Sequence, residues 1–151
     1  MTEDVLAVVR QPPSDETREA AERRHDLEIH VDRVGKVLLV TPVGEIDIVT
    51  GGLFLETLIA AVSAGEARLI VDLTRVPFMD STGLAIFLST HRALRTIDGQ
   101  LRVVAGPQIA ELFELAWMDK FFPVHPDIDA AVRAFVSEGA AAAQIVPQPL
   151  R

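Results

Sequence analysis

The sequence contains no cysteine, and this absence removes several kinds of chemistry at once. Disulfide bonds, thiolate catalysis and cysteine-ligated zinc sites all require the missing side chain. The chain also lacks a run of about 18–20 apolar residues, which a membrane-spanning helix needs. Its first residues, Met1–Asp4, have neither the basic region nor the apolar core of a secretory signal, so we expect a cytoplasmic protein without membrane insertion.

Acidic residues outnumber lysine and arginine, and the formal net charge is −8 at pH 7. Binding to nucleic acid or to an anionic membrane surface depends on basic patches, so we expect neither kind of partner. Hydrophobic residues make up 49% of the 151 residues, enough to bury the core of one domain.

Three segments of different composition divide the chain. Residues 1–26 combine charged residues with Pro12-Pro13 and predict a flexible N-terminal extension, in which residues 15–24 could form a short helix. Residues 27–136 carry regular apolar patterns and predict a single domain. Residues 137–151 are rich in alanine without an amphipathic pattern and predict a flexible C-terminal tail.

Strand and helix patterns alternate through the domain. Short apolar or alternating runs predict strands over residues 27–31, 37–40, 68–73, 101–105 and 121–124. Apolar residues at helical spacing predict helices over residues 53–63 and 82–96, and from residues 107 and 126 onward. This order predicts an α/β fold with a mixed, mostly parallel sheet of four to five strands and about four helices. Pro42 predicts an edge or a bulge near the end of the second strand.

The helical stripes also predict which side chains are buried. They are Leu55, Leu58, Ile59 and Val62 in the first helix, and Leu84, Phe87, Leu88 and Leu94 in the second. Thr50 is the expected N-cap of the first helix, and Gly65 is its expected end. Trp117 ends an apolar helix, so we expect it to be packed.

A polar junction follows the most apolar strand. Asp80, Ser81 and Thr82 precede a helical pattern, and all three residue types are common helix N-caps. A second interpretation is a serine placed for phosphorylation, because amide donors and the helix dipole favour an anion at this position. The spacing of residues leaves both interpretations open.

The residues around Ser81 do not fit the nucleophilic site of a hydrolase. Met79 occupies the place of the first glycine in a nucleophile elbow. His91 lies ten residues further along the same helix, about 15 Å away, too far to act as a base. His25, His30 and His125 have no second histidine at ligand spacing, so we expect no metal site. The sequence has neither a P-loop nor a glycine-rich dinucleotide fingerprint, so we also expect no cofactor.

A phospho-aspartate receiver is a further alternative, with Asp72 as the acceptor at a strand end. Glu45 and Asp47 could imitate its metal-binding acidic pair. The only two lysines, Lys36 and Lys120, do not follow the fourth strand, where a receiver needs one. The simpler interpretation is that Asp72 accepts hydrogen bonds from loop amides.

Two motifs together resemble a known family. The strand exit Gly44-Glu45-Ile46-Asp47 and the junction Asp80-Ser81-Thr82-Gly83-Leu84 are similar to those of STAS domains, and more narrowly to those of bacterial anti-sigma factor antagonists. The similarity covers residues 27–136. It implies a STAS fold and a protein-binding module, not an enzyme.

The resemblance also implies a switch in transcription regulation and stress response. In these proteins an anti-sigma factor, a serine kinase with an ATPase fold, phosphorylates the serine that corresponds to Ser81. The unmodified antagonist sequesters the kinase and thereby releases a sigma factor, and a serine phosphatase reverses the modification. The implied partner-binding residues are Asp47, Asp80, Ser81, Thr82, Gly83 and Leu84.

Other roles of STAS domains remain open alternatives. The chain could be a stressosome-like scaffold or a lipid-transport accessory subunit, in which Ser81 is only a helix cap. The apolar helix faces also leave a homo-oligomer open. A transporter tail is excluded for this chain by itself, because it carries no membrane span.

Overall fold

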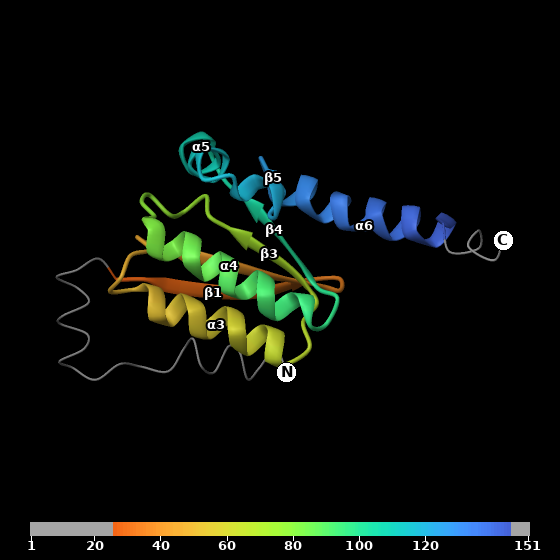
Figure 1. The fold of residues 1–151 in the computed structure, drawn as a ribbon, viewed down its shortest axis with the longest axis horizontal. Coiled ribbons are helices and arrows are strands. Elements are labelled where there is room, and N and C mark those ends of the chain that lie inside the picture. Colours follow the sequence, from red (N-terminus) through yellow and green to blue (C-terminus); the bar gives the residue numbers. More distant parts are fainter. Residues whose placement is uncertain (1–25, 146–151) are drawn as a thin grey trace.

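The sheet has five strands in the order β1-β2-β3-β4-β5 (Figure 1). The structure is a computed structural model that describes residues 26–145, with side chains described through residue 137. The strands are β1 (Glu28–Val34), β2 (Val37–Val43), β3 (Arg68–Asp72), β4 (Gln100–Val104) and β5 (Val124–His125). Only β1 and β2 pair antiparallel, and the other neighbours are parallel. Within the described residues, this confirms the predicted mixed, mostly parallel sheet.

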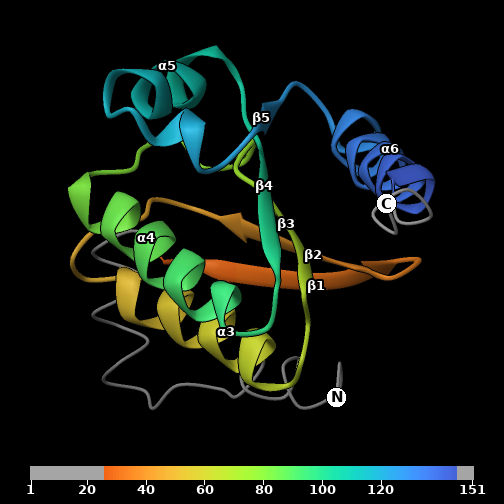
Figure 2. The same cartoon turned by 45° about the vertical axis from the view of Figure 1, so that its right-hand side comes forward.

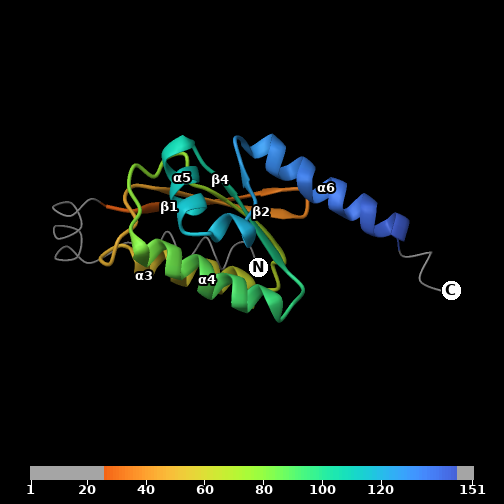
Figure 3. The same ribbon diagram turned by 45° about the horizontal axis from the view of Figure 1, so that its top comes forward.

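Helices cover both faces of the sheet (Figure 2). They are α3 (Gly51–Ser63), α4 (Ser81–Arg95), α5 (Pro107–Leu115) and α6 (Ile128–Ile145), and a short 3-10 helix, η1 (Met118–Lys120), follows α5. The helices α3, α4 and α5 pack against one face, and α6 packs against the other. Figure 3 shows α6 continuing past the sheet.

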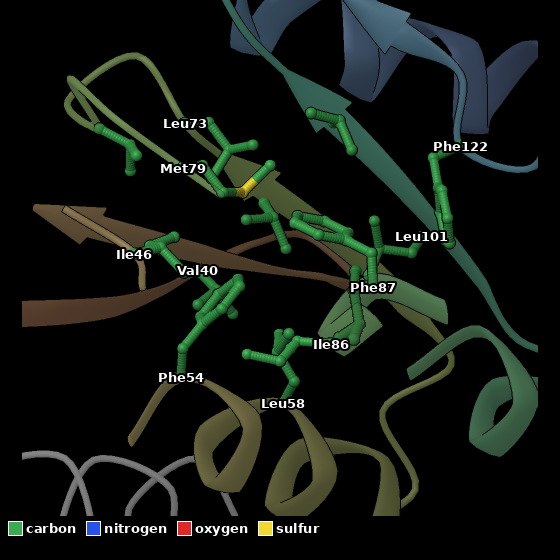
Figure 4. Packing of buried hydrophobic residues seen from close by; sticks show 14 of the residues in the cluster. Val40, Ile46, Phe54, Leu58, Leu73, Met79, Ile86, Phe87, Leu101 and Phe122 are labelled. Atoms are coloured by element: carbon green, nitrogen blue, oxygen red, sulfur yellow. The ribbon is translucent and has the colours of Figure 1, made fainter. Parts of the chain in front are cut away.

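Side chains along each strand point alternately to the two faces of the sheet, and each face has its own hydrophobic core. Leu69 and Val71 of β3 face the larger cluster beneath α3 and α4, whereas Ile70 between them faces α6. Successive side chains of a strand point to opposite faces, so a continuous apolar run such as residues 69–71 suits a strand covered on both sides. Figure 4 shows the larger cluster, in which α4 contributes its aromatic centre.

Phe87 is that centre. Its ring makes edge-on contacts with Phe54 at 5.7 Å, with Phe113 at 5.2 Å and with Phe122 at 5.6 Å between centroids. All four rings are fully buried. Edge-to-face pairs at these separations add to the stabilisation that comes from burial. The cluster therefore fixes α4, and with it residue 81, relative to the sheet.

The buried faces of α3 and α4 differ from the predicted stripes. Phe54 and Ala61 are buried in α3, whereas Leu55 and Ile59 are only half-buried. In α4, Ile86 and Thr90 are buried, whereas Leu84 and Leu88 are half-buried.

Buried threonines explain part of this difference. The hydroxyl groups of Thr57 and Thr90 donate to the carbonyl oxygens of Leu53 and Ile86, each at 2.8 Å. A threonine satisfied in this way presents its methyl group to the core. A pattern built on apolar residues alone misses such positions.

The second strand is also longer than predicted. It continues through Pro42 to Val43, and its register with β1 has no bulge. Pairing with β3 spans Leu38–Val40 and stops before the proline. Pro42 lies beyond the residues of β2 that pair with β3, so its missing N–H interrupts no hydrogen bond between these two strands. The structure therefore shows no bulge, and Pro42 lies near the strand end on the side where β2 has no partner strand, as at an edge.

The segment before β5 carries two further corrections. Residues 121–124 were expected to form a strand, but the strand is Val124–His125, and Phe122 points into the core instead. Trp117 was expected to be packed, but 67% of it is exposed, and its φ is 60°. The turn from α5 into η1 places the indole outward, with the Lys120 ammonium 4.5 Å from its ring centroid.

The ends of the domain are only partly described. The predicted N-terminal extension, including its short helix, lies outside the described residues except for Asp26. At the other end, α6 runs to Ile145, so residues 137–145 of the predicted tail are helical. Alanine has the highest helix propensity, and it needs no amphipathic pattern to continue a helix. The rest of that tail, residues 146–151, lies outside the described part.

His125 links β5 to the sheet face beneath α6. Its Nε2 atom lies 3.1 Å from Nη1 of the buried Arg102, whose guanidinium lies 5.0 Å from the ring centroid of Phe135. Burial, together with the Arg102 charge, lowers the pKa of His125, and Asp127 opposes this only in part. The neutral imidazole is therefore the form that the fold favours.

We expect the stability of the protein to fall as the pH drops below about 6.5, the pKa of an unfolded histidine. The unfolded chain then binds a proton at His125 that the folded chain resists, so acid favours unfolding. Thermal melting between about pH 8 and about pH 5 measures this dependence. His125→Gln should show a shallower fall over this range, and parallel profiles for the two proteins would contradict the assignment.

Candidate functional site

Two segments that leave the sheet lie side by side. Ile46, after β2, forms a parallel bridge with Met79, after β3. The Ile46 N–H donates to the Phe78 carbonyl at 3.0 Å, and the Asp80 N–H donates to the Ile46 carbonyl at 3.2 Å. The carboxyl ends of parallel strands form the edge where α/β proteins commonly meet ligands and partners. This bridge holds the starts of α3 and α4 at that edge.

Asp80, not Ser81, caps helix α4. The backbone of Asp80 is extended, with φ −99° and ψ −168°, and its Oδ1 accepts a hydrogen bond from the Thr82 N–H at 2.8 Å. Ser81 is the first helical residue, and it is exposed. Among the described residues, none donates to or accepts from its hydroxyl. The structure therefore places this hydroxyl in solvent at the positive end of a fifteen-residue helix.

Gly83 and Gly51 allow the two helices to begin close together. A Cβ at position 83 would overlap the Met79 side chain and lie 3.3 Å from Ile46 Cγ2. A Cβ at position 51 would lie 3.0 Å from Thr82 Cγ2 and 3.1 Å from Ile86 Cδ1. Gly83 is buried, so its first role is packing beneath the exposed turn.

Asp47 stabilises the turn before α3. Its Oδ1 accepts from the backbone N–H groups of Val49 at 2.9 Å and Thr50 at 3.1 Å. The Thr50 hydroxyl accepts from the Asp47 N–H at 3.0 Å and donates to the Glu45 carbonyl at 2.8 Å. Thr50 holds the N-cap position as predicted, but its side chain caps no helical amide.

Asp72 accepts hydrogen bonds from the loop after β3, as the simpler interpretation predicted. It is 7% exposed, and its Oδ1 accepts from the Thr74 N–H at 2.9 Å and from the Thr74 hydroxyl at 2.7 Å. The side chains described in residues 26–137 include no group of three suited to hold a metal ion. The carboxylate stabilises the loop after β3, and it is poorly exposed for phosphorylation.

Sequence reasoning missed three exposed apolar side chains at this edge. They are Ile48, 82% exposed, Val49, 52% exposed, and Phe78, 49% exposed. Ile48 and Val49 precede α3 and lie outside its apolar periodicity, which is a signal that the sequence does contain. Leu84, expected both in the core and at a partner surface, is half-buried and packs against the core.

The comparisons with known proteins identify the class. The family model for the STAS domain matches residues 28–131, so the chain belongs to the STAS domain family. Within it, the chain is related to anti-sigma factor antagonists, which are non-enzymatic regulators. No helix among the described residues is long and apolar enough to cross a membrane.

Individual relatives agree with this class. The anti-sigma-B factor antagonist of Staphylococcus aureus is 32% identical over 83 residues, which cover 54% of this chain and 77% of that protein. The crystal structure of an anti-sigma factor antagonist from Mycobacterium paratuberculosis matches with a TM-score of 0.67 at 34% identity, covering 72% of this chain and 93% of that one.

SpoIIAA supports the fold alone, because its sequence is more distant. Its unphosphorylated form matches with a TM-score of 0.58 at 18% identity, covering 72% of this chain and 97% of that one. The phosphorylated Bacillus protein matches with a TM-score of 0.56 at 19% identity, covering 70% of this chain and 98% of that one. The chain thus has the SpoIIAA-like α/β fold.

Proposed function

We propose that this protein is an anti-sigma factor antagonist controlled by phosphorylation of Ser81. Unmodified, it binds and sequesters an anti-sigma factor that is also a serine kinase of the ATPase fold, and a sigma factor is released for transcription. The observation that carries the proposal is the exposed Ser81 hydroxyl at the start of α4, beside a cap supplied by Asp80.

The position suits a reversible phosphate. Backbone N–H groups at a helix N-terminus and the helix dipole stabilise an anion, so a phosphate on Ser81 requires no rearrangement of the fold. Because Asp80 makes the capping bond, the modification also breaks no hydrogen bond of the helix. The alternative in which Ser81 serves only as the helix cap lacks this structural support.

The phosphate would act on the partner through charge. It adds about −1.5 to −2 charges next to Asp80 and near Asp47, at a surface proposed to meet basic groups of the kinase. Repulsion, together with loss of the fit of the hydroxyl, then weakens the complex. A serine phosphatase would restore binding, and Thr82, Gly83 and Leu84 would complete the contact surface.

Phosphorylation by a purified kinase tests the proposal. The full chain is incubated with Mg-ATP and each ATPase-fold anti-sigma factor kinase encoded in its source genome, and phosphopeptides are mapped by mass spectrometry. We expect one phosphate, on Ser81, none on Ser81→Ala, and normal modification of Ser89→Ala, which changes an exposed serine on the same helix. Modification of Ser81→Ala to the wild-type extent, or no modification by any of these kinases, would overturn the proposal.

A further inference from the structure

One group of exposed apolar side chains lies at the sheet edge from which α4 and Ser81 begin. Nine large hydrophobic residues are exposed among the described residues, and three of them, Ile48, Val49 and Phe78, lie within three residues of the Ile46–Met79 bridge. Ile48 is the most exposed of the nine, at 82%. Isolated apolar residues on a surface need no explanation, but a group that the backbone gathers at one point marks an interaction site.

The exposed side chains at this edge favour a protein partner over a small ligand. Two surface recesses, of about 300 and 490 Å³, lie elsewhere, one bordered by His30 and Asp72 and the other by His91 and Phe121. Neither is lined by a residue of the 44–51 or 78–84 segments. Small-molecule sites are concave, whereas protruding apolar side chains are buried only when a partner supplies the recess.

Acidic residues lie on the same two segments as the three apolar residues. Glu45, Asp47 and Asp80 lie on the same two segments and are half-buried. A partner that fits this surface therefore presents an apolar recess bordered by basic side chains. This chemistry differs from that of a second copy of the chain, whose net charge is −8.

We infer that Ile48, Val49 and Phe78 form an apolar anchor that inserts into a recess next to the ATP site of the kinase that modifies Ser81. The inference rests on the proposed function and extends its contact surface beyond the helix start to the loop before α3. Insertion of the anchor would set the position of the Ser81 hydroxyl in the kinase, so the anchor serves both binding and phosphoryl transfer.

Alanine variants of the anchor provide the test. Ile48→Ala and Phe78→Ala should each weaken binding of the purified kinase by about 10- to 100-fold and lower kcat/KM for Ser81 phosphorylation. Val136→Ala is the matched control, because Val136 is 67% exposed on α6, on the opposite face of the sheet. Circular dichroism should show an unchanged fold in all three variants, since each side chain is exposed.

The outcomes separate this inference from the proposed function. If the kinase binds and phosphorylates the wild type, while both anchor variants stay within about twofold of it, the anchor is wrong and the switch stands. Equal weakening by Val136→Ala also overturns the anchor. If the wild type is neither bound nor modified, the proposed function fails, and the anchor fails with it.

Discussion

Ser81→Glu should weaken binding of the anti-sigma factor kinase by about 100-fold or more, which corresponds to about 2.7 kcal/mol. The carboxylate would place an additional negative charge beside Asp80 and occupy space that the kinase needs around the small hydroxyl. Ser81→Ala adds no charge and should bind within a few-fold of the wild type. Isothermal titration calorimetry with the purified kinase measures all three affinities.

The thermal stability of Ser81→Glu shows whether its weaker binding results from unfolding. A glutamate at the first position of α4 lies near the positive end of the helix dipole, so Ser81→Glu should melt at the same temperature as the wild type or slightly higher. Ser89→Glu is the control for charge, because Ser89 is exposed further along the same helix. Equal binding by Ser81→Glu and wild type would contradict a switch based on charge at this residue.

Phe87→Ala should destabilise the domain by about 3–5 kcal/mol, because it leaves a cavity between three other aromatic rings. The total stability of a domain is about 5–15 kcal/mol, so a large share of the protein would be unfolded at moderate urea concentrations. Urea unfolding followed by far-ultraviolet circular dichroism gives the free energy of unfolding.

Phe78→Ala is the matched control for the core. Its ring is 49% exposed and lies outside the aromatic cluster, so its loss should change stability by about 0.5 kcal/mol or less. A similar destabilisation by Phe78→Ala and Phe87→Ala would show that the rings around Phe87 contribute no particular stability.

The fold was predictable because its strands and glycines carry strong local signals. The run Leu69-Ile70-Val71 is typical of a strand covered on both faces, and the structure buries all three side chains completely. Gly65 ends α3 with φ +90°, as a glycine after a helix does. Such features depend on neighbours in the sequence, so a single chain suffices to identify them.

The details of the site depend on contacts between distant segments, which the sequence does not display. Asp80, Ser81 and Thr82 all have the chemistry of an N-cap, and only the extended backbone of Asp80 decides among them. Likewise, Ile48 and Phe78 are thirty residues apart, and the Ile46–Met79 bridge brings them to one edge. The functions of Asp47, Asp80 and Ser81 as partner contacts stay predictions.

Asp80, and not Ser81, caps helix α4, and this has an evolutionary consequence. Under the proposed switch, a lineage that loses its kinase can replace Ser81 by alanine and keep the first turn of α4, whereas replacing Asp80 removes the capping bond that begins the helix. In duplicated copies of the gene, selection for folding alone would retain the aspartate and let the serine drift. If the proposed function is right, a copy with Asp80 but without Ser81 would be a permanently active descendant of a regulated ancestor.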